Sequence, residues 1–196
     1  MANGVAIRPG CTTLRIMAKN NQNKRRITDG RPLSQVAALP FRLGDGGGVE
    51  VLVMTSRETQ RVIIPKGWPI KNRKDWKSAQ IEAREEAGVI GDVGRKRLGQ
   101  YLYWKRLETH FALVKVAVYA LAVRRQLADW PERHERAQIW LSAEDAAMLV
   151  DEPELGALIL DFAQSRAARL LAGSPQKGAR GPAVAAFPAA TGPAAP

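Results

Sequence analysis

The sequence contains few of the residues that build disulfide frameworks or zinc sites. Only one of its 196 residues is a cysteine, and only two are histidines. The single cysteine, Cys11, excludes an internal disulfide and a cage of thiolate ligands, and two histidines argue against a His-rich zinc site. Stability therefore has to come from a hydrophobic core, which a hydrophobic content of 45% can supply.

Long apolar runs are also missing. The longest stretch, residues 114–123, is interrupted by Lys115 and is much shorter than the roughly 18 to 20 apolar residues that a transmembrane helix needs. The N-terminus lacks the apolar segment of a secretory signal. We therefore expect no membrane partner and a cytoplasmic location.

Acidic residues are scarce relative to basic ones. The chain has 30 Lys and Arg against 19 Asp and Glu, a formal net charge of +11. An excess of this size favours anionic partners, either phosphorylated small molecules or a nucleic acid such as RNA, and carries no information about the fold.

The two ends of the chain differ from its middle. Residues 1–32 carry seven Lys and Arg and one Asp, which predicts a mobile basic arm, with a nucleic-acid-binding tail as the alternative. Residues 172–196 contain nine Ala, five Pro and four Gly, a composition that predicts disorder because little surface can be buried. We therefore expect one folded domain over residues 33–171.

The strands are predicted from β-branched and apolar segments. Residues 33–43 and 49–55 flank a glycine-rich turn at 44–48, which predicts a β-hairpin. A short strand at 61–64 ends at a proline. Further strands are predicted at 98–105, 109–123 and 136–141.

Three helices are expected between and after these strands. Asp75 is a suitable N-cap for a helix over residues 76–87, and Gly88 is suited to the position after its last turn. An alanine-rich face predicts that this helix packs closely on a sheet. A short helix is expected from Ser142 to about Val150, and a longer one from residue 151 to about residue 171. This order predicts an α+β fold, an α/β/α sandwich in which helices flank a mixed β-sheet.

Three glutamates stand on one side of the first predicted helix. Glu82, Glu85 and Glu86 are spaced by three and four residues, next to the face that packs on the sheet. Three carboxylates so close together repel one another, and a hard divalent cation such as Mg²⁺ removes this cost. A solvated acidic stripe on a surface helix is the alternative interpretation.

The segment before this helix favours the metal interpretation. Residues 65–69 read Pro-Lys-Gly-Trp-Pro, a tight turn after a strand, where Gly67 allows the backbone to approach a ligand closely. A cluster of cations surrounds this turn. Carboxylates beside many cations predict a metal-assisted phosphate site, because the carboxylates hold the ion and the cations hold phosphate groups. The cations are Lys66, Lys71, Arg73, Lys74 and Lys77.

This pattern resembles the Nudix box, G-x5-E-x7-R-E-U-x-E-E-x-G-U, of the Nudix hydrolase superfamily, where U is a bulky apolar residue. The matching positions run from Gly67 through the three glutamates to Gly88. The turn at 65–69 resembles the branch that acts on diphosphoinositol polyphosphates and diadenosine polyphosphates. Two positions depart from the box: Arg73 replaces an early glutamate and Ile81 replaces an arginine. In the family, the early glutamate and the arginine of the box support and orient the metal-binding carboxylates.

The resemblance implies a Nudix fold and a metal-dependent pyrophosphohydrolase. Its expected cofactor is Mg²⁺ or Mn²⁺, held by Glu82, Glu85 and Glu86, with the Gly67 carbonyl as a further ligand. The same three glutamates are the expected catalytic residues, and the general base is one of them or a later loop glutamate. The expected substrate is a nucleoside diphosphate derivative, a dinucleoside polyphosphate, a diphosphoinositol polyphosphate or a capped RNA end.

Other residues are candidates for holding the substrate. Lys66, Arg73, Lys105 and Arg106 are expected to contact its phosphates, with solvated surface cations as the alternative. Tyr103 or Trp104 could stack on a base, with packing in the core as the alternative. A second function is also compatible with the sequence: a catalytically weak Nudix-fold module that binds RNA or nucleotides through its basic surface.

Overall fold

The structure is a computed structural model that describes residues 31–108 and 110–173. Nearly all of the predicted basic arm and of the predicted disordered tail lies outside the described residues, so both stay predictions. The described helices and strands begin at Leu33 and end at Ala172. Within the described ranges, no helix has the length and apolar character required to span a membrane.

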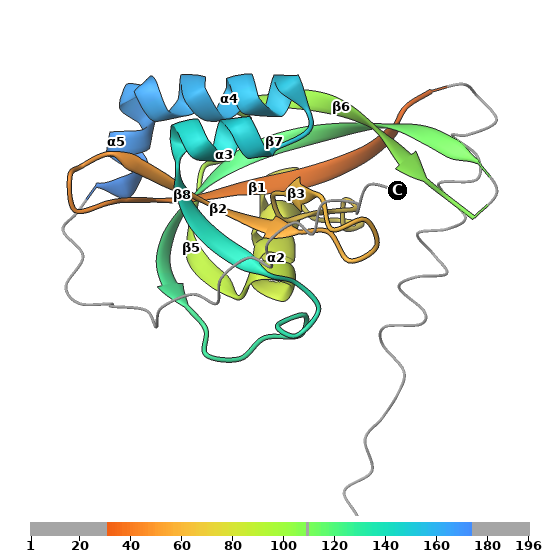
Figure 1. Cartoon of the computed structure of the whole chain (residues 1–196), viewed down its shortest axis with the longest axis horizontal. Coiled ribbons are helices and arrows are strands. Elements are labelled where there is room, and N and C mark those ends of the chain that lie inside the picture. The colour runs from red at the N-terminus through yellow and green to blue at the C-terminus, as the bar shows by residue number, and fades with distance from the viewer. Residues whose placement is uncertain (1–30, 109, 174–196) are drawn as a thin grey trace, which may run out of the picture.

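An eight-stranded mixed sheet forms the centre of the fold (Figure 1). Its main path runs β3-β2-β1-β7-β5, and β4, β6 and β8 pair with β1, β7 and β2. Strands β1 and β7 are parallel, whereas the other pairs are antiparallel. The strands are β1 (Leu33–Leu43), β2 (Val49–Thr55), β3 (Val62–Ile63), β4 (Lys66–Gly67), β5 (Val89–Val93), β6 (Gly99–Arg106), β7 (Phe111–Gln126) and β8 (Gln138–Ser142).

The predicted hairpin is present, and two strands were not predicted. Strands β1 and β2 pair around Phe41 and Val51, as the glycine-rich turn indicates. The short β4 and the strand β5, which follows α2 directly, were missed. In β5 a bulge falls between Ile90 and Gly91. A Cβ at Gly91 would lie 1.9 Å from the carbonyl oxygen of Ala122, so only glycine fits this close pairing.

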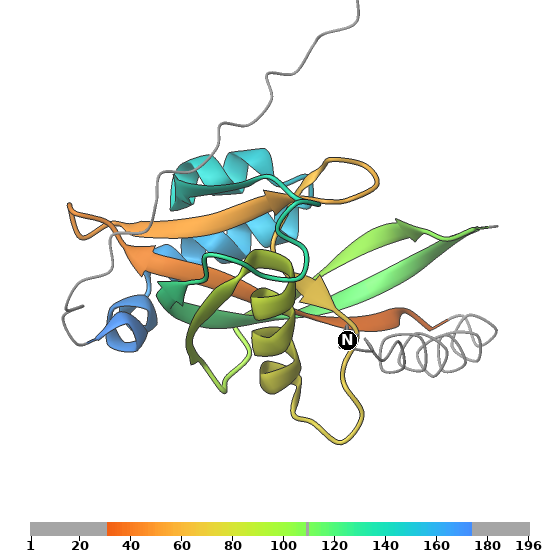
Figure 2. The same ribbon diagram turned by 90° about the horizontal axis from the view of Figure 1, so that it is seen from below.

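Helices cover both faces of the sheet. Helix α2 (Asp75–Ala87) lies on one face, and α3 (Ala143–Leu149) and α4 (Pro153–Gln164) lie on the other (Figures 1 and 2). Helix α5 (Arg166–Ala172) follows α4. The predicted α/β/α sandwich is therefore confirmed.

Helix α2 packs on the sheet through small side chains. Ala79, Ala83 and Ala87 are completely buried, as their spacing predicts. The helix ends at Gly88, whose φ of 65° is left-handed. The predicted N-cap was wrong: Lys74 holds that position without a side-chain hydrogen bond, and Asp75 is the first helical residue. An acidic side chain is favourable there too, because it faces the positive end of the helix dipole.

The last predicted helix is two helices. Ser165 has an extended backbone between α4 and α5, with φ of −75° and ψ of 146°. Its hydroxyl donates to the carbonyl oxygen of Phe162 at 2.7 Å and accepts from the Ala168 N–H at 3.4 Å. The serine therefore caps α5 and ends α4. The predicted cap of α3 is confirmed, since the Ser142 hydroxyl accepts from the Asp145 N–H at 3.0 Å.

Replacing Gly88 with alanine is expected to lower the free energy of unfolding by about 2 to 4 kcal/mol. The left-handed backbone disfavours any Cβ, and this Cβ would lie 2.4 Å from Cδ2 of Trp130. Urea unfolding followed by circular dichroism measures the change. The control is Gly46→Ala, because no atom lies within 4 Å of that Cβ and its φ is not positive. Equal unfolding midpoints for the two variants would contradict the strain at Gly88.

Candidate functional site

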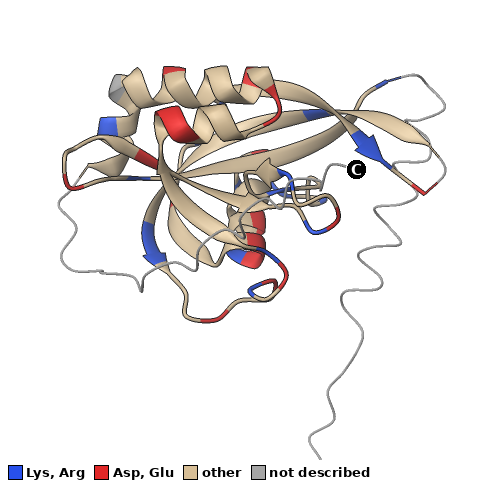
Figure 3. Ribbon diagram, in the orientation of Figure 1, with Lys and Arg blue, Asp and Glu red and all other residues tan. Residues whose placement is uncertain are grey.

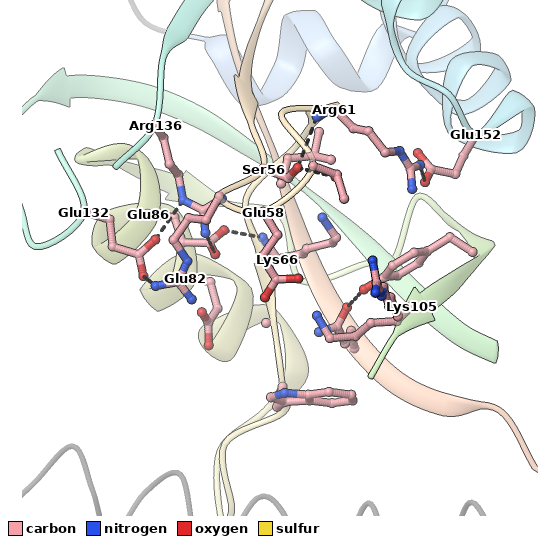
Figure 4. Close-up of a pocket in the computed structure, with 18 of the residues that line it drawn as sticks. Ser56, Glu58, Arg61, Lys66, Glu82, Glu86, Lys105, Glu132, Arg136 and Glu152 are labelled. Atoms are coloured by element: carbon pink, nitrogen blue, oxygen red, sulfur yellow. Dashed lines mark hydrogen bonds and ion pairs between the residues drawn. The ribbon is translucent and has the colours of Figure 1, made fainter. Parts of the chain in front are cut away.

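A pocket of about 560 Å³ opens beside helix α2 (Figure 4). Its walls come from the loop between β2 and β3, from β4, α2 and β6, and from the segment before β8. The lining contains six basic and six acidic side chains. They are Arg57, Arg61, Lys66, Lys105, Arg106 and Arg136, and Glu58, Glu82, Glu85, Glu86, Glu132 and Glu152.

All three predicted glutamates of α2 line this pocket. The Glu82 and Glu86 side chains are buried, each in a residue that is only 8% exposed. The carboxylate of Glu82 lies directly over Gly67, where an added Cβ would sit 2.1 Å from Cδ of Glu82. Glycine at position 67 therefore allows the helix carboxylate to approach the β4 backbone. The structure thus brings Gly67, Glu82, Glu85 and Glu86 together in one pocket.

Both oxygens of the Glu86 carboxylate accept hydrogen bonds. Oε2 accepts from the backbone N–H of Lys66 at 2.9 Å, and Oε1 accepts from Nη2 of Arg136 at 2.5 Å. Burial raises the pKa of Glu86, and the Arg136 charge acts in the opposite direction, together with the Lys66 N–H. The carboxylate is therefore fixed in place from the sheet on one side and from the loop before β8 on the other.

Arg136 is a site residue that sequence reasoning missed. Its side chain is only 5% exposed. Nε donates to Glu132 at 2.7 Å, and Nη1 donates to the carbonyl oxygen of Thr55 at 3.2 Å. Its spacing of four residues from Glu132 is the only local signal, and it does not point to Glu86, 50 residues earlier. Arg136 thus supplies a guanidinium to the carboxylates in a chain where Ile81 stands at the arginine position of the box.

Three of the four predicted phosphate-binding cations line the pocket. Lys66 is one of them, and burial lowers the pKa of its ammonium group to about 8. The Lys66 Nζ is 5.5 Å from the centroid of the Tyr103 ring. Lys105 and Arg106 are the last two residues of β6, and both line the pocket; Figure 3 shows this basic end of β6 in blue. Arg73 is exposed in the loop before α2 and is not part of the pocket lining, so its role at phosphate stays a prediction.

A second polar cluster closes the pocket opposite α2 (Figure 4). Arg61 forms ion pairs with Asp151 and Glu152, which precede α4. Glu152 is 7% exposed, and its Oε2 has no hydrogen-bond partner among the described residues. The Tyr103 hydroxyl donates to Oε1 of Gln35 at 2.7 Å. No local pattern in the sequence predicts this cluster, because its members come from four separate segments.

Two aromatic side chains stand at the rim. Trp104 is 63% exposed and Phe111 is 64% exposed, and both line the pocket. Trp104 faces Leu113 across the β6–β7 pair, and Phe111 is the next residue of β7 on the same face. Among the described residues, no other Phe, Trp or Tyr side chain is exposed. Trp104 is therefore not a core residue.

The donor chemistry of the pocket fits a hard divalent cation. The α2 glutamates offer carboxylate oxygens, and no histidine or cysteine among the described residues lines the pocket. In the arrangement described for residues 31–108 and 110–173, no three acidic, histidine or cysteine side chains converge tightly enough to hold an ion. A Mg²⁺ or Mn²⁺ ion thus fits the ligand types of the pocket, although the described arrangement does not gather three of these ligands around one point.

No family model matches the chain. It is 30% identical over 138 residues to "Nudix hydrolase 18, mitochondrial" of Arabidopsis thaliana, covering 67% of this chain and 76% of the relative. It is 33% identical over 144 residues to "Nudix hydrolase 16, mitochondrial" of the same plant, covering 67% and 79%.

Solved structures share the fold. An Ap4A hydrolase binary complex from C. elegans aligns with a TM-score of 0.51 at 20% identity, covering 66% of this chain and 94% of that one. The dihydroneopterin triphosphate pyrophosphohydrolase of E. coli aligns with a TM-score of 0.52 at 16% identity, with the same coverage. These likenesses show the fold, and the two sequence relatives show that the chain belongs to the Nudix hydrolase superfamily and is a pyrophosphohydrolase.

Proposed function

We propose that the chain catalyses Mg²⁺- or Mn²⁺-dependent hydrolysis of a pyrophosphate bond in a nucleoside diphosphate derivative or a dinucleoside polyphosphate. The observation that carries this proposal is the meeting of the α2 glutamates with Lys66, Lys105 and Arg106 in one pocket. A bound divalent cation supplies charge neutralisation at phosphate oxygens and makes water a better nucleophile. Glu82, Glu85 and Glu86 would hold it, with the Gly67 carbonyl as a further ligand.

The charge balance of the pocket supports the metal requirement. Six carboxylates offset six cations, so the lining as a whole offers little net attraction to a polyphosphate. Neutralising the α2 carboxylates leaves the cations in excess. Lys66, Lys105 and Arg106 are then free to orient the phosphates through charge-assisted hydrogen bonds. Positioning of this kind supplies most of the rate in phosphoryl chemistry.

The rim supports a nucleoside as one end of the substrate. An inositol ring bearing phosphates requires cations all around it, whereas Trp104 and Phe111 offer exposed π-faces. Bases stack on such faces. The C. elegans protein, which shares the fold, is named an Ap4A hydrolase. A dinucleoside polyphosphate such as Ap4A carries two bases. The phosphates would then lie toward α2 and a base toward β6 and β7.

Glu85→Gln is expected to lower kcat/KM for diadenosine tetraphosphate about 100-fold or more, because an amide is a poor ligand for Mg²⁺ and carries no charge. Release of mononucleotides measured by chromatography checks this. The matched control is Glu144→Gln, an exposed acid of α3 outside the pocket. If Glu85→Gln hydrolyses the substrate as fast as the wild type, or if the wild type remains active in excess chelator, the proposed metal dependence is wrong.

Arg136→Lys is expected to weaken Mn²⁺ binding about 10-fold and Arg136→Met about 100-fold, since removing a residue that orients a ligand carries costs of this size. Lysine keeps the charge but cannot reach Glu86, Glu132 and Thr55 at once. Titration calorimetry measures the affinity, and thermal unfolding verifies that each variant is folded. Arg133→Lys, exposed in the same loop, is the control. Tighter binding by Arg136→Met would mean that the guanidinium competes with the ion.

Trp104→Ala is expected to weaken ADP binding about 10-fold in the presence of Mg²⁺ while leaving pyrophosphate binding unchanged, because only ADP has a base to stack. Calorimetry with both ligands measures the two affinities. Leu102→Ala is the matched control, since Leu102 is exposed two residues earlier on the same strand but does not line the pocket. An equal loss for ADP and pyrophosphate would contradict stacking on Trp104.

A further inference from the structure

The positive charge of the described fold is concentrated on one surface. Residues 31–173 carry 22 Lys and Arg and 18 Asp and Glu. Two short segments, 71–77 and 95–97, carry seven of these cations and a single acid, Asp75, so the rest of this range holds more acids than cations. We name the seven the basic surface. Its members are Lys71, Arg73, Lys74, Lys77, Arg95, Lys96 and Arg97.

The two segments meet at the N-terminal end of α2. The ring of Trp76 lies 5.0 Å from Nζ of Lys77 and 5.4 Å from Cζ of Arg95, so one indole contacts both segments. Burial raises the pKa of the Tyr119 hydroxyl, the Asp75 charge raises it further and the Arg97 charge lowers it, so charges from both segments act on this group. Figure 2 shows the loop between β5 and β6 beside the start of α2.

The cations of the basic surface are available to a partner. All seven are exposed, and none forms an ion pair with another described residue. The arginines of the pocket differ, since Arg57, Arg61 and Arg136 are each paired with carboxylates. None of the seven lines the pocket. Their charge therefore lies outside the pocket and does not balance the carboxylates that line it.

We propose that the basic surface binds the phosphate backbone of a nucleic-acid strand, at a place separate from the catalytic pocket. Seven cations without ion pairs, on two adjoining segments of the described chain, match a chain of phosphates, and binding releases the counterions of that chain. A membrane is the less suitable partner. The large apolar side chains exposed in the described range all lie outside segments 71–77 and 95–97, and an interfacial membrane site needs such groups to insert.

The test measures binding of a fluorescein-labelled single-stranded RNA of about 20 nucleotides by anisotropy, over a series of salt concentrations. The full-length chain is compared with a triple variant, Arg95→Gln, Lys96→Gln and Arg97→Gln. Wild type is expected to bind with a steep salt dependence. The triple variant is expected to lose about 10-fold or more in affinity at 0.1 M salt, with a log–log slope smaller by about 2, since each lost phosphate contact removes about 0.7.

The matched control neutralises three exposed cations elsewhere, Arg125→Gln, Arg133→Gln and Arg169→Gln, which removes the same net charge. It is expected to keep most of the affinity and the wild-type slope. Equal losses in the two triple variants would overturn the proposal, because RNA would then respond to net charge alone. The proposal also fails if the wild type does not bind RNA but binds vesicles of phosphatidylserine and phosphatidylcholine, and the 95–97 variant loses this vesicle binding.

Hydrolysis distinguishes this proposal from the proposed activity. The 95–97 variant leaves the pocket untouched, so its kcat/KM for diadenosine tetraphosphate is expected to match wild type. Loss of RNA binding with unchanged hydrolysis supports a separate surface. Loss of both would show that the polyphosphate itself uses these cations. An absence of hydrolysis in wild type, with RNA binding intact, would refute the enzymatic proposal alone.

Discussion

The close packing of α2 on the sheet is the constraint on which the site depends. Ala79, Ala83 and Ala87 bring the helix backbone near the strands, and no larger side chain keeps them apart. At this distance the acidic edge of the helix reaches Gly67, where the missing Cβ leaves room for the Glu82 carboxylate. A bulkier helix face would move the carboxylates away from β4 and from the cations that line the pocket.

Much of the fold and the centre of the site could be predicted because both rest on local spacing. The glutamate spacing and the turn at Gly67 are written within about 20 residues of sequence. The residues that were missed depend on contacts between distant segments. Arg136 reaches Glu86 across 50 positions, and Glu152 meets Arg61 across 91. No periodicity records such pairs. The break at Ser165 was missed for a different reason, since a serine inside an apolar helical pattern is compatible with either outcome.

The charge of the sequence was a weaker guide than the spacing. A net charge of +11 suggests a positive active site, but the pocket lining holds equal numbers of acids and cations. The cations near the box in sequence divide between two places. Lys66 lies in the pocket, whereas Arg73 lies in the exposed loop that leads into α2. Two cations that are only seven residues apart thus lie on different surfaces. Closeness to the motif in sequence therefore does not show that a side chain lies in the pocket.

The parallel pairing of β1 with β7 also determines when the pocket can exist. Partner residues such as Leu33 and Val114 are about 80 positions apart, so a long loop has to close before these strands join. The buried face of α2 packs on Tyr119, Leu121 and Val123 of β7. A nascent chain whose β7 is still inside the ribosome therefore lacks the strand against which α2 packs. Fragments that stop short of β7 have every carboxylate of the motif and no catalytic centre.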